Sequence, residues 1–331
     1  MNNRTVDNIR LENLVVGYKN KTLLKELNLQ IETGKFIVLL GNNGAGKSSL
    51  LNTILGINQP ISGDILYSNQ AISQMKTSEI AKQVAVVFSN LTHIPTIKVA
   101  DLIEIGANDH FSYKQQMALN RVILEEIPIK NILDKYATEI SEGQLQLAMI
   151  TRALKQNTPF LLLDEPTANL DLGNQFRIFD LLKKLSKQLQ KTFLMATHQV
   201  DLALEMADEI WWIENKQLVS GLPEDIAYRY RILEKLSDNI LQFIPSRNIY
   251  SIPIETKKTV NLQGEGELFY WTSKALLKQG YQQSSLSQTS VIVREKEIYY
   301  EDKTFHSIEK FIYYFIPVSY THLRAHETLR Y

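Results

Sequence analysis

The stretch Gly41–Ser48, which reads Gly-Asn-Asn-Gly-Ala-Gly-Lys-Ser, decides the fold of this 331-residue chain. It follows the continuous apolar run Phe36–Leu40, which is typical of a buried strand. It leads into Lys47–Leu55, a helical stretch that Gly56 is placed to end. A strand, a glycine-rich turn and a helix in this order form a loop whose backbone N–H groups cradle phosphate oxygens. The sequence therefore predicts a site for a nucleoside triphosphate.

The residues of this loop have separate expected tasks. Gly41, Gly44 and Gly46 leave room for the backbone to turn its N–H groups inward. Lys47 is expected to reach the β- and γ-phosphates, and the hydroxyl of Ser48 to bind Mg²⁺. The residues expected to bind the nucleotide here are Gly41, Asn42, Asn43, Gly44, Ala45, Gly46, Lys47, Ser48 and Ser49. A glycine-rich turn without a ligand is the alternative, and the complete pattern after a buried strand disfavours it.

Two carboxylates follow a second apolar run. Phe160–Leu163 predicts a buried strand, and Asp164 and Glu165 come directly after it. At this strand end, Asp164 is expected to hold Mg²⁺ and Glu165 to act as the general base toward water. His198 follows the apolar run Thr192–Ala196, at the carboxyl edge of the predicted sheet, where ligands bind. A lone histidine is usually structural, but its position at this edge of the sheet makes His198 a catalytic candidate.

The segment Ile140–Gln144, Ile-Ser-Glu-Gly-Gln, has two compatible interpretations. Ser141 and Gln144 fit a capping box that begins a helix over 142–154. Ser141, Gly143 and the N-terminus of that helix also fit an anion site. A second anion site in a chain with one phosphate loop suggests that two chains share nucleotides face to face.

Apolar patterns predict how the motifs are connected. Alternation over 9–18 and 23–31 predicts an antiparallel hairpin, and Tyr18 is either an adenine-stacking residue or a core aromatic. The pattern from about 91 to 136 is helical. Helical spacing also predicts a helix over 172–190, with apolar residues Phe176, Phe179, Leu182, Leu185 and Leu189. Strand, helix and strand in this order imply a parallel α/β sheet with crossover helices.

Composition changes after about residue 222, where the chain becomes richer in Tyr, Gln and Ser. Strand patterns at 290–293 and 297–300 and a helical pattern at 307–316 predict a small accessory α+β domain over 223–316, of open role, after a nucleotide-binding domain over 1–222. The stretch 317–331 resembles the translation of a sequencing adapter, and we expect it not to be native. Its His322 and His326 have no third candidate metal ligand.

Charge and composition exclude several classes of protein. Lys and Arg (36) balance Asp and Glu (36), so no basic face for nucleic acid is expected. The chain has no cysteine, which excludes a disulfide framework. The residues 1–8 lack the apolar core of a signal peptide, and runs such as Phe36–Leu40 are too short to cross a bilayer. If the protein works at a membrane, another subunit anchors it.

Together these motifs resemble the ATPase subunit of ATP-binding-cassette (ABC) importers, specifically the group for iron complexes (siderophore or haem) and cobalamin. The resemblance covers about residues 9–222. It rests on Tyr18, 41–49, 140–144, 160–166, 168–171, His198 and the segment Asp-Leu-Ala-Leu-Glu-Met-Ala-Asp at 201–208. It implies a P-loop NTPase fold with a parallel sheet core, an antiparallel β subdomain and a helical subdomain.

The same resemblance implies an activity and partners. ATP hydrolysis with Mg²⁺ would drive a homodimer bound to membrane permease subunits at the cytoplasmic face of the membrane, served indirectly by a substrate-binding protein. Ser141, Gly143 and Gln144 would grip the nucleotide held by the other subunit. Asp171 would communicate between the two ATP sites, and His198 would contact the γ-phosphate.

The sequence departs from the family pattern at three positions. Ser89 stands where the family usually has a glutamine that senses Mg²⁺ and contacts the permease, so coupling is expected to differ in detail. Glu142 stands where glycine is commoner, and Gln199 where aspartate often follows the histidine. The permease is expected to dock between Ser89 and about Tyr136.

Alternative functions remain open or are disfavoured. A soluble ABC ATPase of translation or DNA repair would have tandem cassettes or a long coiled-coil insertion, whereas this chain has one cassette and a short stretch between Lys47 and Ser141. A binding-only regulator conflicts with the presence of Lys47, Asp164 and Glu165. A GTPase is disfavoured because no Asn-Lys-x-Asp occurs. An importer ATPase for another substrate stays an alternative.

Overall fold

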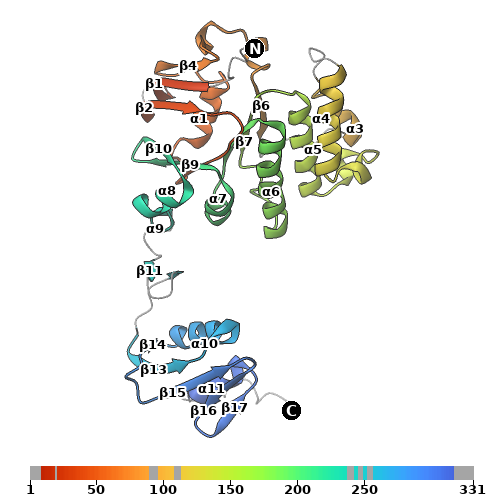
Figure 1. The fold of residues 1–331 in the computed structure, drawn as a ribbon. Coiled ribbons are helices and arrows are strands. Elements are labelled where there is room, and N and C mark those ends of the chain that lie inside the picture. The colour runs from red at the N-terminus through yellow and green to blue at the C-terminus, as the bar shows by residue number, and fades with distance from the viewer. Residues whose placement is uncertain are drawn as a thin grey trace, which may run out of the picture. The chain divides into compact units, whose positions relative to one another are not determined.

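The computed structural model describes residues 9–18, 21–88, 96–107, 113–236, 242–244, 249–251 and 256–316. It divides the chain into two compact units, Met1–Asp238 and Asn239–Tyr331 (Figure 1). The predicted boundary after residue 222 falls ahead of two short helices, α8 (Pro223–Tyr230) and α9 (Ile232–Leu236). Both belong to the first unit, because Ile226 and Ile232 are buried in its core.

The first unit is built on a six-stranded sheet in the order β10-β9-β3-β8-β7-β6. All neighbours are parallel except β10, which pairs with β9 in antiparallel fashion. The strands are β3 (Phe36–Gly41), β6 (Val84–Phe88), β7 (Phe160–Asp164), β8 (Thr192–Ala196), β9 (Glu209–Glu214) and β10 (Gln217–Gly221). Every residue of β3 is buried, as expected for a strand covered on both faces.

A four-stranded antiparallel sheet, in the order β2-β1-β4-β5, forms a second layer. Its strands are β1 (Ile9–Tyr18), β2 (Lys21–Ile31), β4 (Ser62–Tyr67) and β5 (Gln70–Ala71). The predicted hairpin is confirmed, since β1 and β2 pair in antiparallel fashion from Ile9↔Ile31 to Tyr18↔Lys21. One hydrophobic core lies between this sheet and the central sheet, with Leu50 and Ile54 of the first helix inside it.

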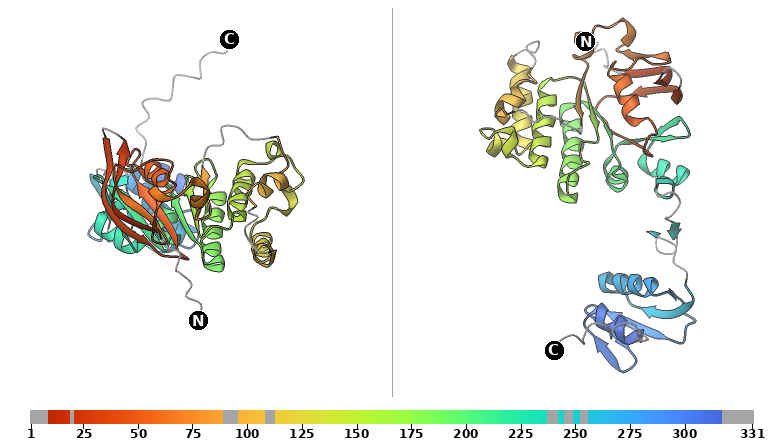
Figure 2. Two further views of the ribbon diagram at one scale, coloured as in Figure 1. Left: turned by 90° about the horizontal axis from the view of Figure 1, so that it is seen from above. Right: turned by 180° about the vertical axis from the view of Figure 1, so that it is seen from behind.

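Helices cover the other face of the central sheet, and some of them form a separate group beside it (Figure 2). The helices of the first unit before α8 are α1 (Lys47–Ile54), α2 (Thr77–Ile80), α3 (Val99–Glu104), α4 (Tyr113–Glu126), α5 (Glu142–Lys155), α6 (Leu172–Leu189) and α7 (Val200–Met206). Short 3₁₀ turns occupy Ile72–Gln74, Lys130–Ile132 and Ala137–Glu139. A second core joins the central sheet to α5, α6 and α7. Helices α3, α4 and α5 gather beyond α6, which confirms the predicted helical subdomain.

The second unit contains a five-stranded sheet in the order β14-β13-β15-β16-β17. Its elements are β11 (Gln242–Ile244), β12 (Ile249–Ser251), β13 (Lys258–Gln263), α10 (Gly266–Lys278), β14 (Tyr281–Gln283), β15 (Ser290–Arg294), β16 (Glu297–Tyr300), β17 (Lys303–Phe305) and α11 (Ile308–Phe315). Strand β15 alternates between buried and exposed residues, so one face of the sheet packs on α10 and α11. This arrangement matches the predicted α+β extension.

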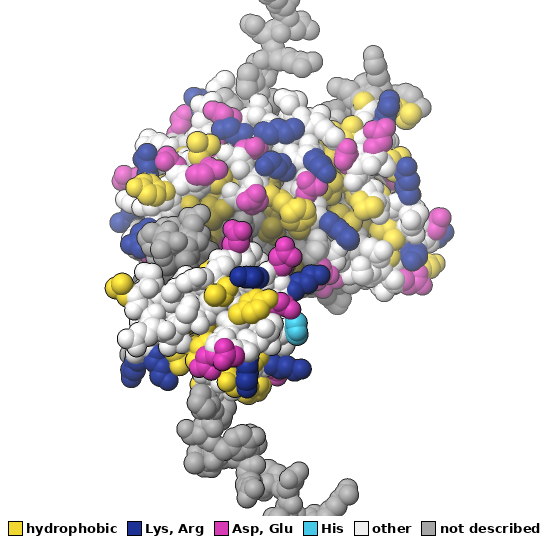
Figure 3. Space-filling view, turned by 60° about the horizontal axis from the view of Figure 1, so that its bottom comes forward, with side chains coloured by type: hydrophobic (Ala, Val, Ile, Leu, Met, Phe, Trp, Pro, Cys, Tyr) yellow, Lys and Arg dark blue, Asp and Glu magenta, His cyan; other side chains and the backbone are white. Residues whose placement is uncertain are grey.

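The surface carries both signs of charge. Over the face shown in Figure 3, Lys and Arg side chains are interspersed with Asp and Glu side chains and form no continuous basic stripe. Among the helices of the described residues, none has the length and apolarity needed to cross a membrane. Ser89 and the stretch 317–331 lie outside the described residues.

Candidate nucleotide-binding site

The phosphate loop joins β3 to α1, as its sequence predicts. Gly44 and Gly46 adopt positive φ angles of 75° and 106°, a region that residues with a Cβ atom rarely occupy. Gly41 is favoured for a different reason: an added Cβ would lie 3.2 Å from the side chain of Ile213 and 3.3 Å from that of Ala45, so these neighbours would have to shift. The backbone N–H of Ala45 donates to the carbonyl of Asn42, which closes the turn.

Lys47 is the first residue of α1 and is buried. Its Nζ donates to the carbonyl oxygens of Gly41, at 2.8 Å, and Asn42, at 3.4 Å. The ammonium group therefore lies folded back over the loop that it belongs to. Burial lowers its pKa, and the nearby carboxylates of Glu165 and Asp164 act in the opposite sense. An anion held by the loop would favour the charged form of this lysine.

The pairing of β7 with β8 brings Glu165 and His198 together. Asp164 lies opposite Ala196 in the two strands, and the N–H of Glu165 donates to the carbonyl of Ala196 at 2.9 Å. Glu165 has a positive φ of 51°, which is uncommon for a residue with a side chain. Its Oε1 lies 2.9 Å from Nε2 of His198. The strained turn after β7 thus aims the carboxylate at the imidazole.

The contacts of His198 indicate which groups of this cluster carry protons. Nε2 of His198 lies 2.9 Å from the Glu165 carboxylate and 3.4 Å from Nζ of Lys47. If Nε2 of His198 carries a proton and donates it to the Glu165 carboxylate, it has no lone pair with which to accept a hydrogen bond. The Lys47 ammonium can only donate, so these two nitrogens then form no hydrogen bond. Burial, and next the lysine charge, lower the pKa of His198. Burial raises the pKa of Glu165, and the lysine charge offsets part of this effect.

Asp164 presents a buried oxygen toward the same edge of the sheet. Its Oδ1 is buried and has no hydrogen-bond partner among the described residues, which is costly for a carboxylate unless a cation or water satisfies it. Ser48 is exposed in the first turn of α1. Within the described ranges, no three His, Cys, Asp or Glu side chains gather to hold a metal. These residues fit a hard cation such as Mg²⁺, which usually keeps several waters and few protein ligands.

Tyr18 ends β1 with its side chain 57% exposed, so it is not a core residue. Its hydroxyl lies 3.3 Å from Oγ of Ser49 in α1. The ring therefore lies beside the phosphate-loop helix with a face open to solvent, which leaves it free to stack on a planar ligand.

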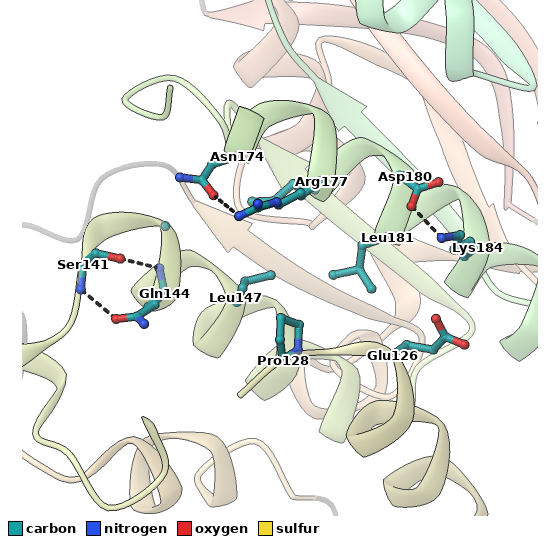
Figure 4. A pocket seen from close by; sticks show the side chains of 12 residues that line it. Glu126, Pro128, Ser141, Gln144, Leu147, Asn174, Arg177, Asp180, Leu181 and Lys184 are labelled. Atoms are coloured by element: carbon teal, nitrogen blue, oxygen red, sulfur yellow. Dashed lines mark hydrogen bonds and ion pairs between the residues drawn. The ribbon is translucent and has the colours of Figure 1, made fainter. Parts of the chain in front are cut away.

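Ser141 and Gln144 form the predicted capping box at the start of α5. The Ser141 Oγ accepts from the Gln144 N–H, and the Gln144 Oε1 accepts from the Ser141 N–H at 3.1 Å. Both line one end of a cavity of about 500 Å³, which has Asp180 and Lys184 at its other end (Figure 4). The cavity residues are Glu126, Pro128, Ser141, Gly143, Gln144, Leu147, Asn174, Arg177, Ile178, Asp180, Leu181 and Lys184.

The two predicted anion sites are apart within one chain. In Figures 1 and 2, α5 and α1 lie on opposite sides of β6 and β7. The cavity beside Ser141 includes no phosphate-loop residue. The structure therefore brings together Lys47, Asp164, Glu165 and His198, and leaves Ser141, Gly143 and Gln144 elsewhere on the surface.

Asp171 begins α6 as its N-cap. Its Oδ1 accepts from the N–H of Asn174 at 2.9 Å, and its Oδ2 from the side-chain amide of Asn174 at 2.8 Å. An added Cβ on Gly143 would lie 3.5 Å from that same amide nitrogen. Asp171 thus lies beside the start of α5, at the edge of the chain that also carries Ser141.

Sequence reasoning missed Gln175 and Asn169. Gln175 is buried in α6 and donates to two carbonyls of the loop before Asp171. Asn169, in that loop, donates to Glu142 of α5 at 2.8 Å. A signal for Gln175 was available, because it is a polar residue four positions before the core residue Phe179 of the same helix.

Comparison with known proteins agrees with this geometry. The family described as ABC transporter matches residues 24–168. The petrobactin import ATP-binding protein of Bacillus anthracis is 33% identical over 224 residues, which cover 66% of this chain and 82% of that protein. The chain belongs to the family of ABC transporter ATP-binding proteins. As such a protein it binds ATP and is an ATPase.

Further relatives of this ATP-binding protein support the assignment. The iron(3+)-hydroxamate import ATP-binding protein of Bacillus subtilis is 32% identical over 60% of this chain and 76% of its own length. The solved structure of cbiO1 from Clostridium perfringens, part of an ABC transporter complex, has a TM-score of 0.61 at 26% identity and covers 71% of this chain and 96% of its own. Residues 257–315 match the family described as iron ABC transporter C-terminal domain.

Proposed function

We propose that this ATPase powers an importer of iron complexes, as a homodimer bound to permease subunits at the cytoplasmic face of a membrane. The observation that carries the ATPase part is the cluster at the phosphate loop, where Nε2 of His198 lies 2.9 Å from the Glu165 carboxylate and 3.4 Å from Nζ of Lys47. The iron-complex substrate is supported by the siderophore-import relatives and by the match of residues 257–315 to an iron-transporter domain.

The proposed chemistry begins with nucleotide binding. The N–H groups of the phosphate loop and Lys47 hold the phosphates, and Tyr18 stacks on adenine. Ser48 and Asp164 would hold Mg²⁺, and the ion would supply neutralisation of phosphate charge. The positions of Gly44 and Gly46 in left-handed backbone leave the loop open toward the ligand.

Hydrolysis then depends on the cluster beside the γ-phosphate. Glu165 accepts a proton from the attacking water, and His198 orients the carboxylate and contacts the γ-phosphate. Catalysis of this kind consists mostly of positioning and charge neutralisation. The strained backbone of Glu165 supports this role, since such strain is concentrated at functional sites.

The separation of the two predicted anion sites supports the proposed dimer. Because Ser141 and Gly143 lie away from the phosphate loop of their own chain, they are free to contact the nucleotide of a second copy. In the closed dimer each ATP is held by the phosphate loop of one subunit and by the start of α5 of the other. Asp171, beside that helix start, then faces the partner subunit.

An uptake experiment tests the importer function. We expect a strain that lacks this gene to lose import of a radio-iron siderophore or haem, and expression of the intact chain to restore it. The Glu165→Gln variant at equal abundance should not restore it. Uptake of an unrelated sugar serves as the control.

If uptake of iron complexes is normal without the gene, the iron assignment is wrong. Cobalamin uptake in the same strain distinguishes an importer for another substrate.

The pH dependence of hydrolysis tests the role of Glu165. Burial raises the pKa of its carboxyl group, and only the ionised form can accept a proton. We therefore expect kcat/KM, which reports the free protein, to fall on acidification at a higher pH than the ordinary glutamate value of 4.5. The fluorescence of the buried Trp211 and Trp212, recorded at each pH, shows whether the fold persists. A kcat/KM that stays constant until the protein unfolds would contradict this role.

A further inference from the structure

The cavity beside the start of α5 has a largely aliphatic lining. Ile178 and Leu181 of α6 are buried residues that line it, and Leu147 of α5 and Pro128 face the same space (Figure 4). Among the described residues, no aromatic side chain lines it. Its volume of about 500 Å³ falls within the range of sites for small molecules, which are mostly apolar with a few fixed polar groups. The cavity thus has room for a small ligand with an aliphatic body.

Charges are already paired at the end of the cavity that lies along the later turns of α6. Nζ of Lys184 lies 2.7 Å from Oδ2 of Asp180. This carboxylate, through its hydrogen bond and its charge, raises the pKa of Lys184. Oε1 of Glu126 accepts from Nε2 of Gln188 at 2.7 Å, so it adds a second carboxylate at this end. An ammonium beside two carboxylates leaves this end with a net negative charge.

Arg177, one turn earlier on α6 than Asp180, has no such partner. Its Nη1 donates to Oδ1 of Asn174 at 3.4 Å, and no carboxylate pairs with it among the described residues. The side chain is exposed and lines the cavity (Figure 4). A guanidinium presents a planar fork of N–H donors that matches the two oxygens of a carboxylate. The group that the cavity best accommodates beside Arg177 is therefore an anion of that shape.

We propose that this cavity binds an aliphatic monocarboxylate, which inhibits the ATPase by keeping a second copy of the chain away. The carboxylate pairs with Arg177, and the alkyl chain covers Leu147, Ile178 and Leu181. The charge of Arg177 selects an anion over a neutral molecule. The apolar lining selects an alkyl chain over a small hydrophilic acid.

The spacing of the charges sets the length of the ligand and its number of carboxylates. Arg177 and Lys184 lie on the same side of α6, about 10 Å apart along its axis. A chain of medium length, such as that of octanoate, reaches from the guanidinium toward the Asp180 end. A second carboxylate at its tip would meet the net negative charge there. A monocarboxylate should therefore bind better than the dicarboxylate of equal length.

The position of the cavity explains why a bound ligand would affect hydrolysis. Ser141 and Gly143, which line it, are the residues that contact the nucleotide of a second copy in the proposed function. This part of the inference rests on that function. A ligand in the cavity lies beside that surface and obstructs the approach of the second copy. By linkage, closure of the dimer must weaken ligand binding by the same factor.

Isothermal titration calorimetry of octanoate into the ATP-free full chain tests the site. We expect octanoate to bind. Octanol and suberate, the dicarboxylate of equal chain length, should bind more weakly. Arg177→Gln should weaken octanoate binding about tenfold, because it removes a charge-assisted pair. Arg177→Lys keeps the charge without the fork, so its affinity should fall between those of the parent and Arg177→Gln.

The matched control is Arg229→Gln, which changes an exposed arginine that pairs with Asp225 on α8, outside the lining of the cavity. This variant should bind octanoate as the parent chain does. If octanol binds as tightly as octanoate, or if Arg177→Gln and Arg229→Gln lose equal affinity, the site is wrong.

Gel filtration of the Glu165→Gln chain with ATP and Mg²⁺ tests the inhibition. Octanoate should return this chain from dimer to monomer, and it should lower the ATPase rate of the parent chain. Combined with Arg177→Gln, the Glu165→Gln chain should need about tenfold more octanoate for the same effect. If octanoate binds but the dimer persists at saturation, the inhibitory role is wrong.

The outcome is separable from that of the proposed dimer. If the Glu165→Gln chain stays monomeric with ATP and no octanoate, the shared nucleotide site is wrong, while calorimetry on the ATP-free chain still decides the ligand site. If Arg177→Gln alone abolishes the dimer, a second copy occupies the cavity, and the assignment of a small ligand is overturned.

Discussion

Replacement of Glu165 by glutamine is expected to stop ATP hydrolysis and to trap an ATP-bound dimer. The amide oxygen still accepts the Nε2–H of His198, so the local geometry is preserved. The base is lost, because an amide does not take a proton from water. Removal of general-base catalysis typically costs about 10²–10⁴ in kcat. Binding is not impaired, so the closed state accumulates once ATP is bound.

Gel filtration with and without ATP and Mg²⁺ measures this outcome. The Glu165→Gln chain should elute as a dimer only with ATP, whereas the parent chain should return to monomer as ATP is consumed. Glu205→Gln is a matched control, because it makes the same change on the exposed surface of α7. A Glu165→Gln chain that stays monomeric at saturating ATP would show that nucleotides are not shared between two copies.

Replacement of Lys47 by alanine is expected to weaken ATP binding by about a hundredfold or more. The ammonium is the one buried cation at the phosphate loop in the described part of the chain. Hydrogen bonds from an ammonium to charged phosphates are strong. In the described residues its Nζ donates to the carbonyls of Gly41 and Asn42, and Nε2 of His198 lies 3.4 Å away. The anion that would best stabilise its charge is therefore the nucleotide.

Thermal unfolding with increasing ATP measures this loss. ATP should raise the unfolding temperature of the parent chain, because a ligand that binds only the folded state stabilises it. The Lys47→Ala chain should show no such rise at the same concentrations. Lys82→Ala, on the exposed surface, should respond as the parent does. An undiminished ATP response in Lys47→Ala would refute the phosphate-loop assignment.

Elements with strong local signals were predicted correctly. The apolar runs of β3, β7 and β8 and the long helical pattern of α6 are present within a residue or two of their expected bounds. Helix α6 also shows the limit of such patterns. Phe176 was expected on its apolar face, yet it is 50% exposed, and Gln175 is buried in its place. The loop at 167–171 accepts hydrogen bonds from Gln175, and local hydrophobicity cannot reveal these contacts.

Other elements were not predicted from the sequence or were assigned to the wrong unit. Strand β9 contains Trp211 and Trp212, both fully buried, and completes the central sheet beside β3. Helices α8 and α9 follow the predicted boundary but pack on the first unit through Ile226 and Ile232. Which unit a helix packs on depends on contacts between segments far apart in the chain. Composition alone does not reveal these contacts.

The sequence by itself determined the phosphate loop, the carboxylates that end β7 and the capping box of α5. Each of these depends on neighbouring residues, so a short motif specifies its conformation and its chemistry. Only the tertiary structure decided that His198 meets Glu165 at 2.9 Å, and that α5, which Ser141 caps, lies on the other side of β6 and β7 from α1. The sheet order inserts β8 between β3 and β7, against the order of the chain, and this pairing of distant strands is fixed by packing of the whole core.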